Sequence, residues 1–177
     1  MLKHITFVYT NKKHVTFVST NEIRKGMKIE DEIKSTIALD ISKKIILNVL
    51  YTQNVIIDNF NDILKPYDIS GEQYNVLRIL RGQKGSPANM FVIQERMLAR
   101  TSNTTRLVDK LLLKNLVTRN VCPENRRKIE VLITEKGLNV LNELDPKVIE
   151  HEEFFSNNLS SQEAEQLNSL LEKYRNK

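Results

Sequence analysis

The side chains of this sequence that could do chemistry are cations and short polar groups gathered between residues 84 and 130. This stretch carries ten Lys or Arg residues against four Asp or Glu, whereas residues 131–177 carry five against nine. The whole chain has a net charge of +5, so its positive charge is concentrated in the middle. A local excess of this kind is typical of proteins that bind an anionic partner such as nucleic acid.

The stretch 102–114 predicts a helix that presents some of these groups on one face. At 100° per residue, the side that must face a core consists of Leu107, Val108, Leu111 and Leu112, with Thr104 beside them. The opposite side is short, polar and cationic, which suits a helix that enters the major groove of DNA by its N-terminal half. The residues predicted to read bases are therefore Ser102, Asn103, Thr105, Arg106 and Lys110.

A second basic cluster follows directly in the chain. Residues 116–121 and 128–133 are rich in β-branched residues and predict a hairpin. Adjacent cations on a loop repel one another, whereas the narrow minor groove of DNA attracts them. The cations expected to contact the DNA backbone from this hairpin are Arg119, Arg126, Arg127 and Lys128.

The elements before these groups are predicted to be helical. Isoleucine or valine recurs every four residues from Ile29 to Val49, which predicts one long amphipathic helix from Met27 that ends before Pro66. A capping box of Ser70 and Gln73 begins a second helix, which stops at Gly82. Asn89 is expected to cap a short helix that turns Ile93, Met97 and Leu98 inward, and after a turn at residues 100–101 Ser102 is expected to cap the next helix.

Two more helices are predicted after the hairpin. Thr134 is placed to cap a long helix that Pro146 should kink, and a final helix begins after Ser160 or Ser161. A helix-turn-helix followed by a hairpin is a winged helix. The predicted fold is therefore mainly α with a small β-hairpin wing, in which residues 70–144 form the winged helix and residues 27–64 and 145–177 form flanking dimerisation helices.

Residues 125–137 resemble the wing signature of the MarR family of bacterial transcriptional regulators. That signature runs Asp-x-Arg, five variable residues and Leu-Thr, and here Asn125 stands in the place of the Asp and Ile133 in the place of the Leu. Residues 102–111 are similar to the recognition helix of the same family, and residues 116–119 to its entry into the wing. The resemblance covers residues 27–177. It implies a homodimer that binds a pseudo-palindromic operator in double-stranded DNA, as a repressor that a small ligand releases.

The apolar stripes of the first and last helices support a homodimer independently. Each stripe is too long for a small winged domain to cover, and pairing across a two-fold axis would bury both. The alternative is that the two helices cover each other within one chain. The residues expected at the dimer interface are Ile33, Ile37, Ile41, Leu167 and Leu171.

Other functions find less support in the sequence. A winged helix used for protein–protein assembly would expose an apolar recognition face, whereas this face is cationic. The sequence has no pairing of a nucleophile with a base, no phosphate-binding loop and no cluster of metal ligands, so neither an enzyme nor a cofactor is expected. His151 has no second histidine one turn away, so it is not expected to bind a metal ion.

The lone Cys122 lies beside arginines in the sequence. It is expected to have no role of its own, and the alternative is a redox sensor. No apolar run approaches the roughly 18 residues of a membrane span, which together with the single cysteine predicts a cytoplasmic protein.

Residues 1–26 are unlike the rest of the chain. Residues 3–11 recur almost unchanged ten positions later as residues 13–21, and both copies are rich in β-branched and aromatic side chains. The two copies could pair as a hairpin, but a lone hairpin is marginally stable in water. The other interpretation is an appendage ahead of an internal start at Met27, without a function of its own.

We predict that a chain beginning at Met27 matches the full chain in melting temperature and in affinity for duplex DNA, because the predicted winged helix and dimerisation helices all lie after residue 26. Differential scanning fluorimetry and fluorescence anisotropy with a labelled duplex measure the two quantities. A fall of several degrees in melting temperature on deletion would mean that the repeat packs on the rest of the protein.

Overall fold

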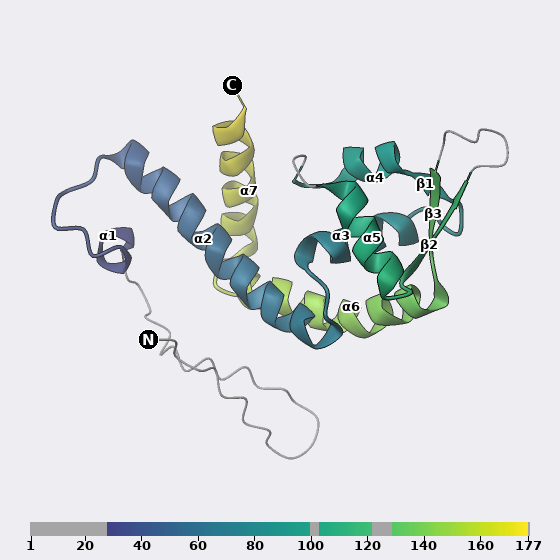
Figure 1. The fold of residues 1–177 in the computed structure, drawn as a ribbon. Helices are drawn as coiled ribbons and strands as arrows, with labels where there is room; N and C mark the ends of the chain where they lie inside the picture. Colours follow the sequence, from purple (N-terminus) through teal and green to yellow (C-terminus); the bar gives the residue numbers. More distant parts are fainter. Residues whose placement is uncertain (1–27, 100–102, 122–128, 177) are drawn as a thin grey trace, which may run out of the picture. The chain divides into compact units, whose positions relative to one another are not determined.

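The computed structural model describes residues 28–99, 103–121 and 129–176 (Figure 1). The chain divides into two compact units, Met1–Gln53 and Asn54–Lys177, and each is described by itself. Several sequence predictions lie outside the described residues. They concern the repeat before Met27, the turn at 100–101, Ser102, Cys122 and the wing cations Arg126, Arg127 and Lys128.

The helical part of the first unit is interrupted. Helix α1 spans Ile29–Glu32, residues 33–40 are not helical, and α2 spans Ile41–Leu64, so the prediction of one continuous helix from Met27 is wrong. Lys34 has a left-handed backbone, with φ of 53°, and the Ser35 hydroxyl donates to the Ile37 carbonyl at 2.9 Å. The Asp40 carboxylate accepts the backbone N–H of Lys43 at 2.9 Å. Short polar side chains that bond to nearby backbone compete with helix, and here they outweigh the isoleucine spacing.

The first unit is also held by polar contacts between its helices. Lys44 forms an ion pair with Glu30, and this hydrogen bond lowers the pKa of the Glu30 carboxyl group. The Tyr51 hydroxyl donates to the Glu32 carboxylate at 2.8 Å. These contacts join α1 to the first half of α2.

Most of the predicted helix ends in the second unit are confirmed. After α2 the chain passes through the 3₁₀ helix η1, Lys65–Tyr67, into α3, Gly71–Arg81, which begins with the Ser70–Gln73 capping box and is followed by Gly82. The Asn89 side chain caps α4, Met90–Arg96, by accepting the N–H of Val92 at 3.0 Å.

Two details around the next helix differ from the prediction. Helix α5 spans Thr104–Leu113, and its N-cap is Asn103 rather than Ser102, because the Asn103 side-chain oxygen accepts the N–H of Arg106 at 3.1 Å. Leu98 is 94% exposed rather than turned inward, whereas Ile93 and Met97 are buried. Helix α4 ends at Arg96 and Met97 is extended, so Leu98 no longer follows the helical spacing.

The predicted hairpin is part of a three-stranded antiparallel sheet. Strand β2, Val117–Val121, pairs with β3, Ile129–Ile133, so that Arg119 lies opposite Val131. A third strand, β1, spans Ala88–Asn89 and pairs with the other edge of β3, which makes the order β1-β3-β2. Two residues are too few to show a strand pattern, and the second of them, Asn89, is also the N-cap of α4, so the sequence did not predict β1.

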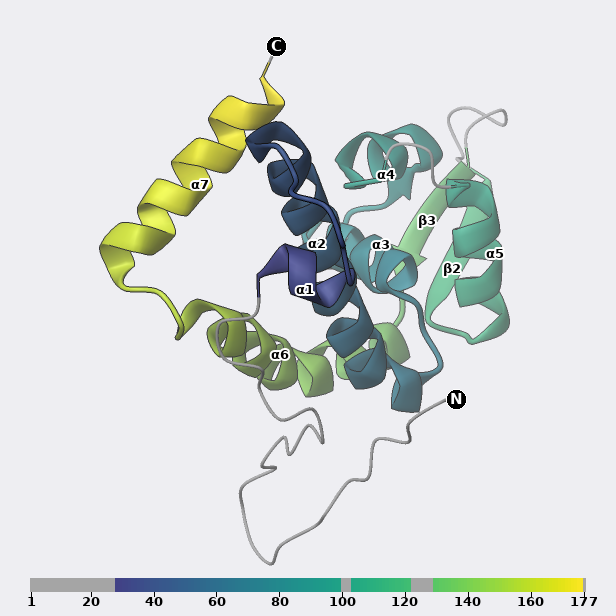
Figure 2. The same ribbon diagram turned by 90° about the vertical axis from the view of Figure 1, so that its left-hand side faces the viewer.

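The core of the second unit lies between α3, α5, the sheet and α6 (Figure 2). Helix α6, Glu135–Ser156, is capped by Thr134 as predicted and continues through Pro146. Arg81 on α3 donates two hydrogen bonds to the Asp145 carboxylate of α6, at 2.7 and 2.9 Å, and these bonds raise the pKa of the guanidinium group. The last helix, α7, spans Ser161–Arg175, begins with a Ser160–Glu163 capping box and buries none of its residues. The fully buried side chains of this core include Leu64, Leu77, Ile93, Val108, Leu111, Val131, Leu141 and Leu144.

Gly137 marks the closest approach between α6 and the end of α5. A Cβ at this position would lie 2.3 Å from the carbonyl oxygen of Leu116 and 2.8 Å from the Cγ1 atom of Ile133. Both separations are well inside van der Waals contact, and the nearer atom is backbone, which cannot rotate away. Only glycine therefore fits where the start of α6 passes the segment that leads from α5 into β2.

We predict that Gly137→Ala lowers the free energy of unfolding by about 2 kcal/mol, within the range expected for overpacking a core. The matched control is Gly82→Ala, where the new Cβ would meet nothing closer than 3.4 Å and the backbone is right-handed. The control should leave stability unchanged or slightly raised. Urea denaturation of both variants tests this, and equal midpoints for Gly137→Ala and the unsubstituted chain would contradict it.

Candidate nucleic-acid interface

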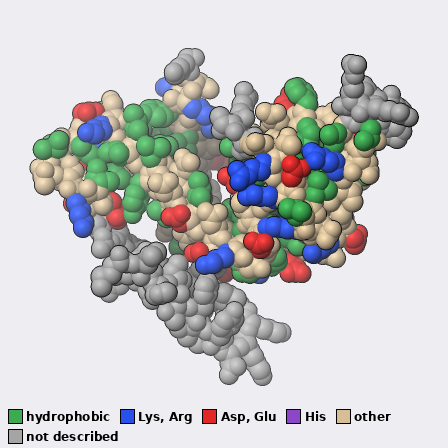
Figure 3. Space-filling model, viewed as in Figure 1, with side chains coloured by type: hydrophobic (Ala, Val, Ile, Leu, Met, Phe, Trp, Pro, Cys, Tyr) green, Lys and Arg blue, Asp and Glu red, His purple; other side chains and the backbone are tan. Residues whose placement is uncertain are grey.

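The burial of one side of α5 determines which of its residues are presented to solvent. Val108 and Leu111 are fully buried, and Thr104 is buried beside them. Arg106 and Lys110 lie on the other side and are exposed. The predicted division of this helix into an apolar and a polar face is therefore confirmed. Figure 3 shows Lys and Arg side chains gathered over the surface where α5 lies in Figure 1.

The residues predicted to read bases have different structural roles. Thr105, Arg106 and Lys110 are exposed, and the structure leaves their side chains facing solvent. Asn103 is exposed as well, but its side-chain oxygen is used to cap α5. Its amide NH₂ group remains as the donor that could reach a base. Because the cap orients the first turn of α5, Asn103 also positions its neighbour Arg106.

Arg119, predicted to contact DNA from the hairpin, is tied to α5. Its Nη1 atom donates to the Asp109 carboxylate at 2.7 Å, which joins β2 to α5. The Nε atom of Arg119 is buried and has no hydrogen-bond partner among the described residues. Sequence reasoning missed the role of Asp109, because ion pairs ten residues apart follow no local spacing rule. The other predicted hairpin cations belong to residues 122–128, outside the described part of the chain.

The residues predicted at the dimer interface are exposed apolar side chains in the single chain. Ile33 and Ile37 lie in the segment between α1 and α2, and Ile41 begins α2. Leu167 and Leu171 lie on α7. Their exposed fractions range from 39% to 70%, which is unusually high for large apolar side chains.

The described residues offer little support for other kinds of site. They contain no group of three or more His, Cys, Asp or Glu that could hold a metal ion. The ring of His151 packs between Phe60 and Phe155, and its Nε2 atom lies 3.3 Å from the Ile56 carbonyl oxygen. Within residues 28–99, 103–121 and 129–176, no helix is long and apolar enough to cross a membrane.

Comparisons with known proteins agree with this geometry. Residues 69–129 match the model of the MarR family. The chain is 28% identical over 116 residues to the HTH-type transcriptional regulator MhqR of Bacillus subtilis, covering 66% of this chain and 79% of the relative.

Two solved structures have the same fold. The MarR transcription factor from Planctomyces limnophilus is 29% identical and superposes with a TM-score of 0.60, covering 77% of this chain and 98% of the other. Bordetella bronchiseptica BpsR, whose structure concerns the regulation of its DNA binding by 6-hydroxynicotinic acid, has a TM-score of 0.69 at 17% identity, covering 80% and 99%.

The matched segment begins just before α3, contains the whole of α5 and ends at the start of β3, so it covers the helix-turn-helix with its exposed cationic face and the first strand of the hairpin. The sequence resemblance, the fold and these matches lead to one conclusion: residues 69–129 carry the winged helix-turn-helix of the MarR family of transcriptional regulators, a family that binds DNA and is not enzymatic.

Proposed function

We propose that this regulator is a homodimeric repressor that binds a pseudo-palindromic operator and is released from it by a small ligand. The observation that carries the proposal is the exposed polar face of α5, where Arg106 and Lys110 project away from a buried apolar side. Arginine and lysine on such a face suit hydrogen bonds to guanine edges and to phosphates. The base-reading residues we propose are Asn103, Thr105, Arg106 and Lys110, with Ser102 before them.

Contacts to the DNA backbone are assigned to the hairpin. Arg126, Arg127 and Lys128 connect β2 to β3, and the sheet fixes where both strands end. Arg119 is held against α5 by Asp109, so we assign it the role of bracing the hairpin against the recognition helix as well as adding positive charge.

The exposed apolar side chains of the two terminal regions support a dimer. Large apolar groups on α7 and on the segment from Ile33 to Ile41 lose contact with water when two chains pair across a two-fold axis. A two-fold dimer would place its recognition helices about 34 Å apart, one turn of DNA. Release by a small ligand is supported by analogy with BpsR, whose DNA binding is regulated by 6-hydroxynicotinic acid.

We expect duplex binding to depend steeply on salt. If each protomer neutralises three to five phosphates, the dimer should lose about 10³–10⁵ in affinity between about 50 and 200 mM salt. Arg106→Ala should relax the preference for operator over random duplex by about 1–3 kcal/mol, whereas Arg127→Ala should weaken both duplexes alike. Selection of bound fragments from genomic DNA provides the operator, and fluorescence anisotropy measures the affinities.

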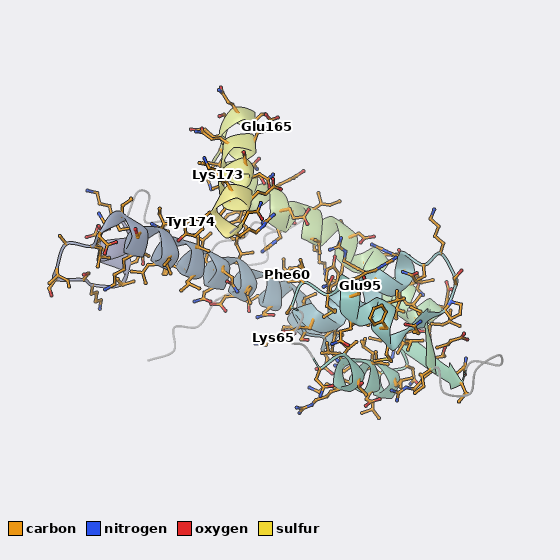
Figure 4. The ribbon with its side chains drawn as sticks, turned by 90° about the horizontal axis from the view of Figure 1, so that it is seen from above. Phe60, Lys65, Glu95, Glu165, Lys173 and Tyr174 are labelled. Atoms are coloured by element: carbon orange, nitrogen blue, oxygen red, sulfur yellow. The ribbon has the colours of Figure 1, made fainter. Side chains whose placement is uncertain are left out.

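The matched control for these variants is Lys173→Ala on α7, which removes a positive charge outside the winged helix (Figure 4). It should leave the ratio of operator to random affinity unchanged. Equal affinity of the unsubstituted chain for operator and random duplex at every salt concentration would exclude sequence-specific binding.

We expect Leu167→Asp to break the dimer. Leu167 is half exposed in the single chain, so the aspartate should not disturb the winged helix, but it would bury an unpaired charge in the dimer. The control is Glu165→Asp, two positions away and about 200° around the same helix, where an aspartate replaces an exposed acid. Sedimentation velocity should show a monomer only for Leu167→Asp, with circular dichroism confirming that it remains helical. An intact Leu167→Asp dimer would remove α7 from the proposed interface.

A further inference from the structure

Helix α6 contains a proline near the point where it leaves the core of the winged helix. Leu144, before Pro146, is fully buried in that core, whereas Ile149 and Phe154, after it, are 55% and 48% exposed. The helix leads from the sheet towards α7 (Figure 1). Because proline has no backbone N–H, the carbonyl group of Asn142, four residues earlier, lacks the donor that would close its turn. Helices bend most readily at such a position.

The residues on either side of the proline both contact the segment that contains α3. Asp145 accepts two hydrogen bonds from Arg81, the last residue of α3, at 2.7 and 2.9 Å. Lys147 donates to the hydroxyl group of Tyr67, in η1, at 2.8 Å, and its Nζ atom lies 4.9 Å from the centre of the Tyr67 ring. The proline is therefore flanked by one contact to the end of α3 and one to the turn that precedes α3.

The two contacts lie on different sides of α6. At 100° per residue, positions 145 and 147 are about 200° apart around the helix axis. Contacts on nearly opposite sides resist bending in both senses, whereas one contact alone resists it in one. The pair of Arg81 with Asp145 is bidentate, and a bidentate pair also fixes the relative orientation of its two groups.

These contacts are not needed to hold the core together. The side chains of Arg81 and Asp145 are 33% and 40% exposed, and Lys147 is exposed. Polar contacts at this level of exposure contribute little to stability, because water and side-chain entropy oppose them. Their position on either side of Pro146 points instead to a role in the direction that α6 takes after it.

A small bend at the proline has a large effect on distant groups. A small domain is about 30 Å across, so a bend of roughly 10° at its edge moves its far side by about 5 Å. The rise of one base pair is about 3.4 Å. In a dimer that is held together beyond Pro146, such a bend changes the separation of the two recognition helices by more than one base pair.

We propose that the contacts of Asp145 with Arg81 and of Lys147 with Tyr67 hold α6 in one direction across Pro146, and thereby determine which spacing of operator half-sites the protein accepts. Pro146 and these two contacts are called the α6 joint. Asp145 and Lys147 are positioning residues, because they act through the orientation of α5 and not through contact with DNA. The assignment rests on the proposed homodimer, to which it adds the residues that make half-site spacing specific.

The α6 joint is tested first without DNA, by one distance within a single chain. Nitroxide labels are attached to cysteines that replace the exposed Glu95 of α4 (Figure 4) and the exposed Glu153 of α6, in a full chain in which Cys122 is changed to serine. Labelled chains are diluted with an excess of unlabelled chains, so that each dimer carries one labelled pair. Double electron–electron resonance should give a narrow distance distribution for this chain.

Loss of both contacts should change this distribution. Asp145→Asn combined with Lys147→Met should broaden or shift it by about 3 Å or more, the order of displacement that a bend of roughly 10° produces. The matched control is Glu143→Gln combined with Lys173→Met, which makes the same changes of charge at exposed positions outside the two contacts. An unchanged distribution in the first variant, or equal broadening in the control, would overturn the α6 joint.

A milder variant removes the same contacts from the side of α3. Tyr67→Phe combined with Arg81→Lys keeps the ring and the positive charge, but it removes the hydroxyl acceptor and the bidentate pair. It should broaden the distribution as well, and circular dichroism checks that it is folded. A folded variant with an unchanged distribution would overturn the α6 joint even if the variant at Asp145 and Lys147 did not fold.

Pro146→Ala separates the proline from its neighbours. Alanine restores the N–H that the carbonyl group of Asn142 lacks, so α6 should keep its direction without the two contacts. In this background, Asp145→Asn with Lys147→Met should leave the distance distribution narrow. Broadening as large as that seen with proline would mean that the contacts support α6 for another reason, and would overturn the α6 joint.

The effect on DNA is measured separately, with the operator obtained by selection and with versions whose half-sites are one base pair closer or farther apart. This displacement should lower the affinity of the unsubstituted chain about tenfold or more, because a dimer of fixed geometry cannot engage both half-sites. In Asp145→Asn with Lys147→Met the loss should fall to about threefold or less, whereas the control variant should keep the full loss.

Two readouts distinguish the inference from the function on which it rests. The ratio of operator to random affinity in the unsubstituted chain tests the proposed function alone, and the distance distribution tests the α6 joint without DNA. An unchanged preference for one spacing in Asp145→Asn with Lys147→Met would overturn the role of these residues in specificity.

Discussion

The burial of the apolar side of α5 is the constraint on which the rest of the second unit depends. Val108 and Leu111 are fully enclosed by α3, the sheet and their neighbours, so this helix has one rotational setting about its axis. That setting turns Arg106 and Lys110 to solvent and brings Asp109 to the strand that carries Arg119. A charged face built in this way needs no loop to hold it, because the core orients it. The hydrophobic effect thus determines where the cations are presented, although no cation takes part in it.

The end of α5 is held by the start of α6. The carbonyl groups of Lys114, Asn115 and Leu116 accept hydrogen bonds from Lys136, from the Thr134 hydroxyl and from the Thr134 backbone N–H, respectively. Gly137 allows this close approach because it has no Cβ. Farther along α6, the pair of Asp145 with Arg81 adds a second connection, to α3. Helix α6 is therefore attached to the winged helix at two places, and in the proposed dimer these attachments would set the spacing of the two recognition helices.

The acidic and basic groups around α5 have distinct roles. Asp109 and Asp68 each hold one cation, Arg119 and Lys114, which leaves Arg106, Lys65 and Lys110 without an ion pair in the described structure. Exposed ion pairs of this kind contribute little to stability, typically less than about 1 kcal/mol. Their consequence is to decide which positive charges stay available to a partner. Arg106 and Lys110 lie on the exposed side of α5, and Lys65 is exposed in η1.

The sequence by itself determined the features that arise from residues a few positions apart. The caps at Ser70, Asn89 and Thr134, the apolar side of α5 and the pairing of β2 with β3 all follow local rules of spacing and hydrogen bonding, and the structure confirms them. The last helix was predicted to begin after Ser160 or Ser161, and in the structure Ser160 is its cap. Local rules also explain the errors. The polar residues Ser35 and Asp40 interrupted a helix that isoleucine spacing alone predicted to be continuous. The predicted cap of α5, Ser102, was one residue too early, since the neighbouring Asn103 has a side-chain oxygen that serves the same purpose.

Only the tertiary structure decided the features that join distant parts of the chain. The two-residue strand β1 exists because the edge of β3 is there to pair with it. Arg81 and Asp145 are 64 residues apart in the sequence, and Lys114 and Asp68, which form an ion pair, are 46 residues apart. No periodicity encodes such pairs, since they depend on how complete elements pack against one another. The sequence could therefore predict which face of α5 is cationic, whereas the packing of the helices decided what lies beside that face.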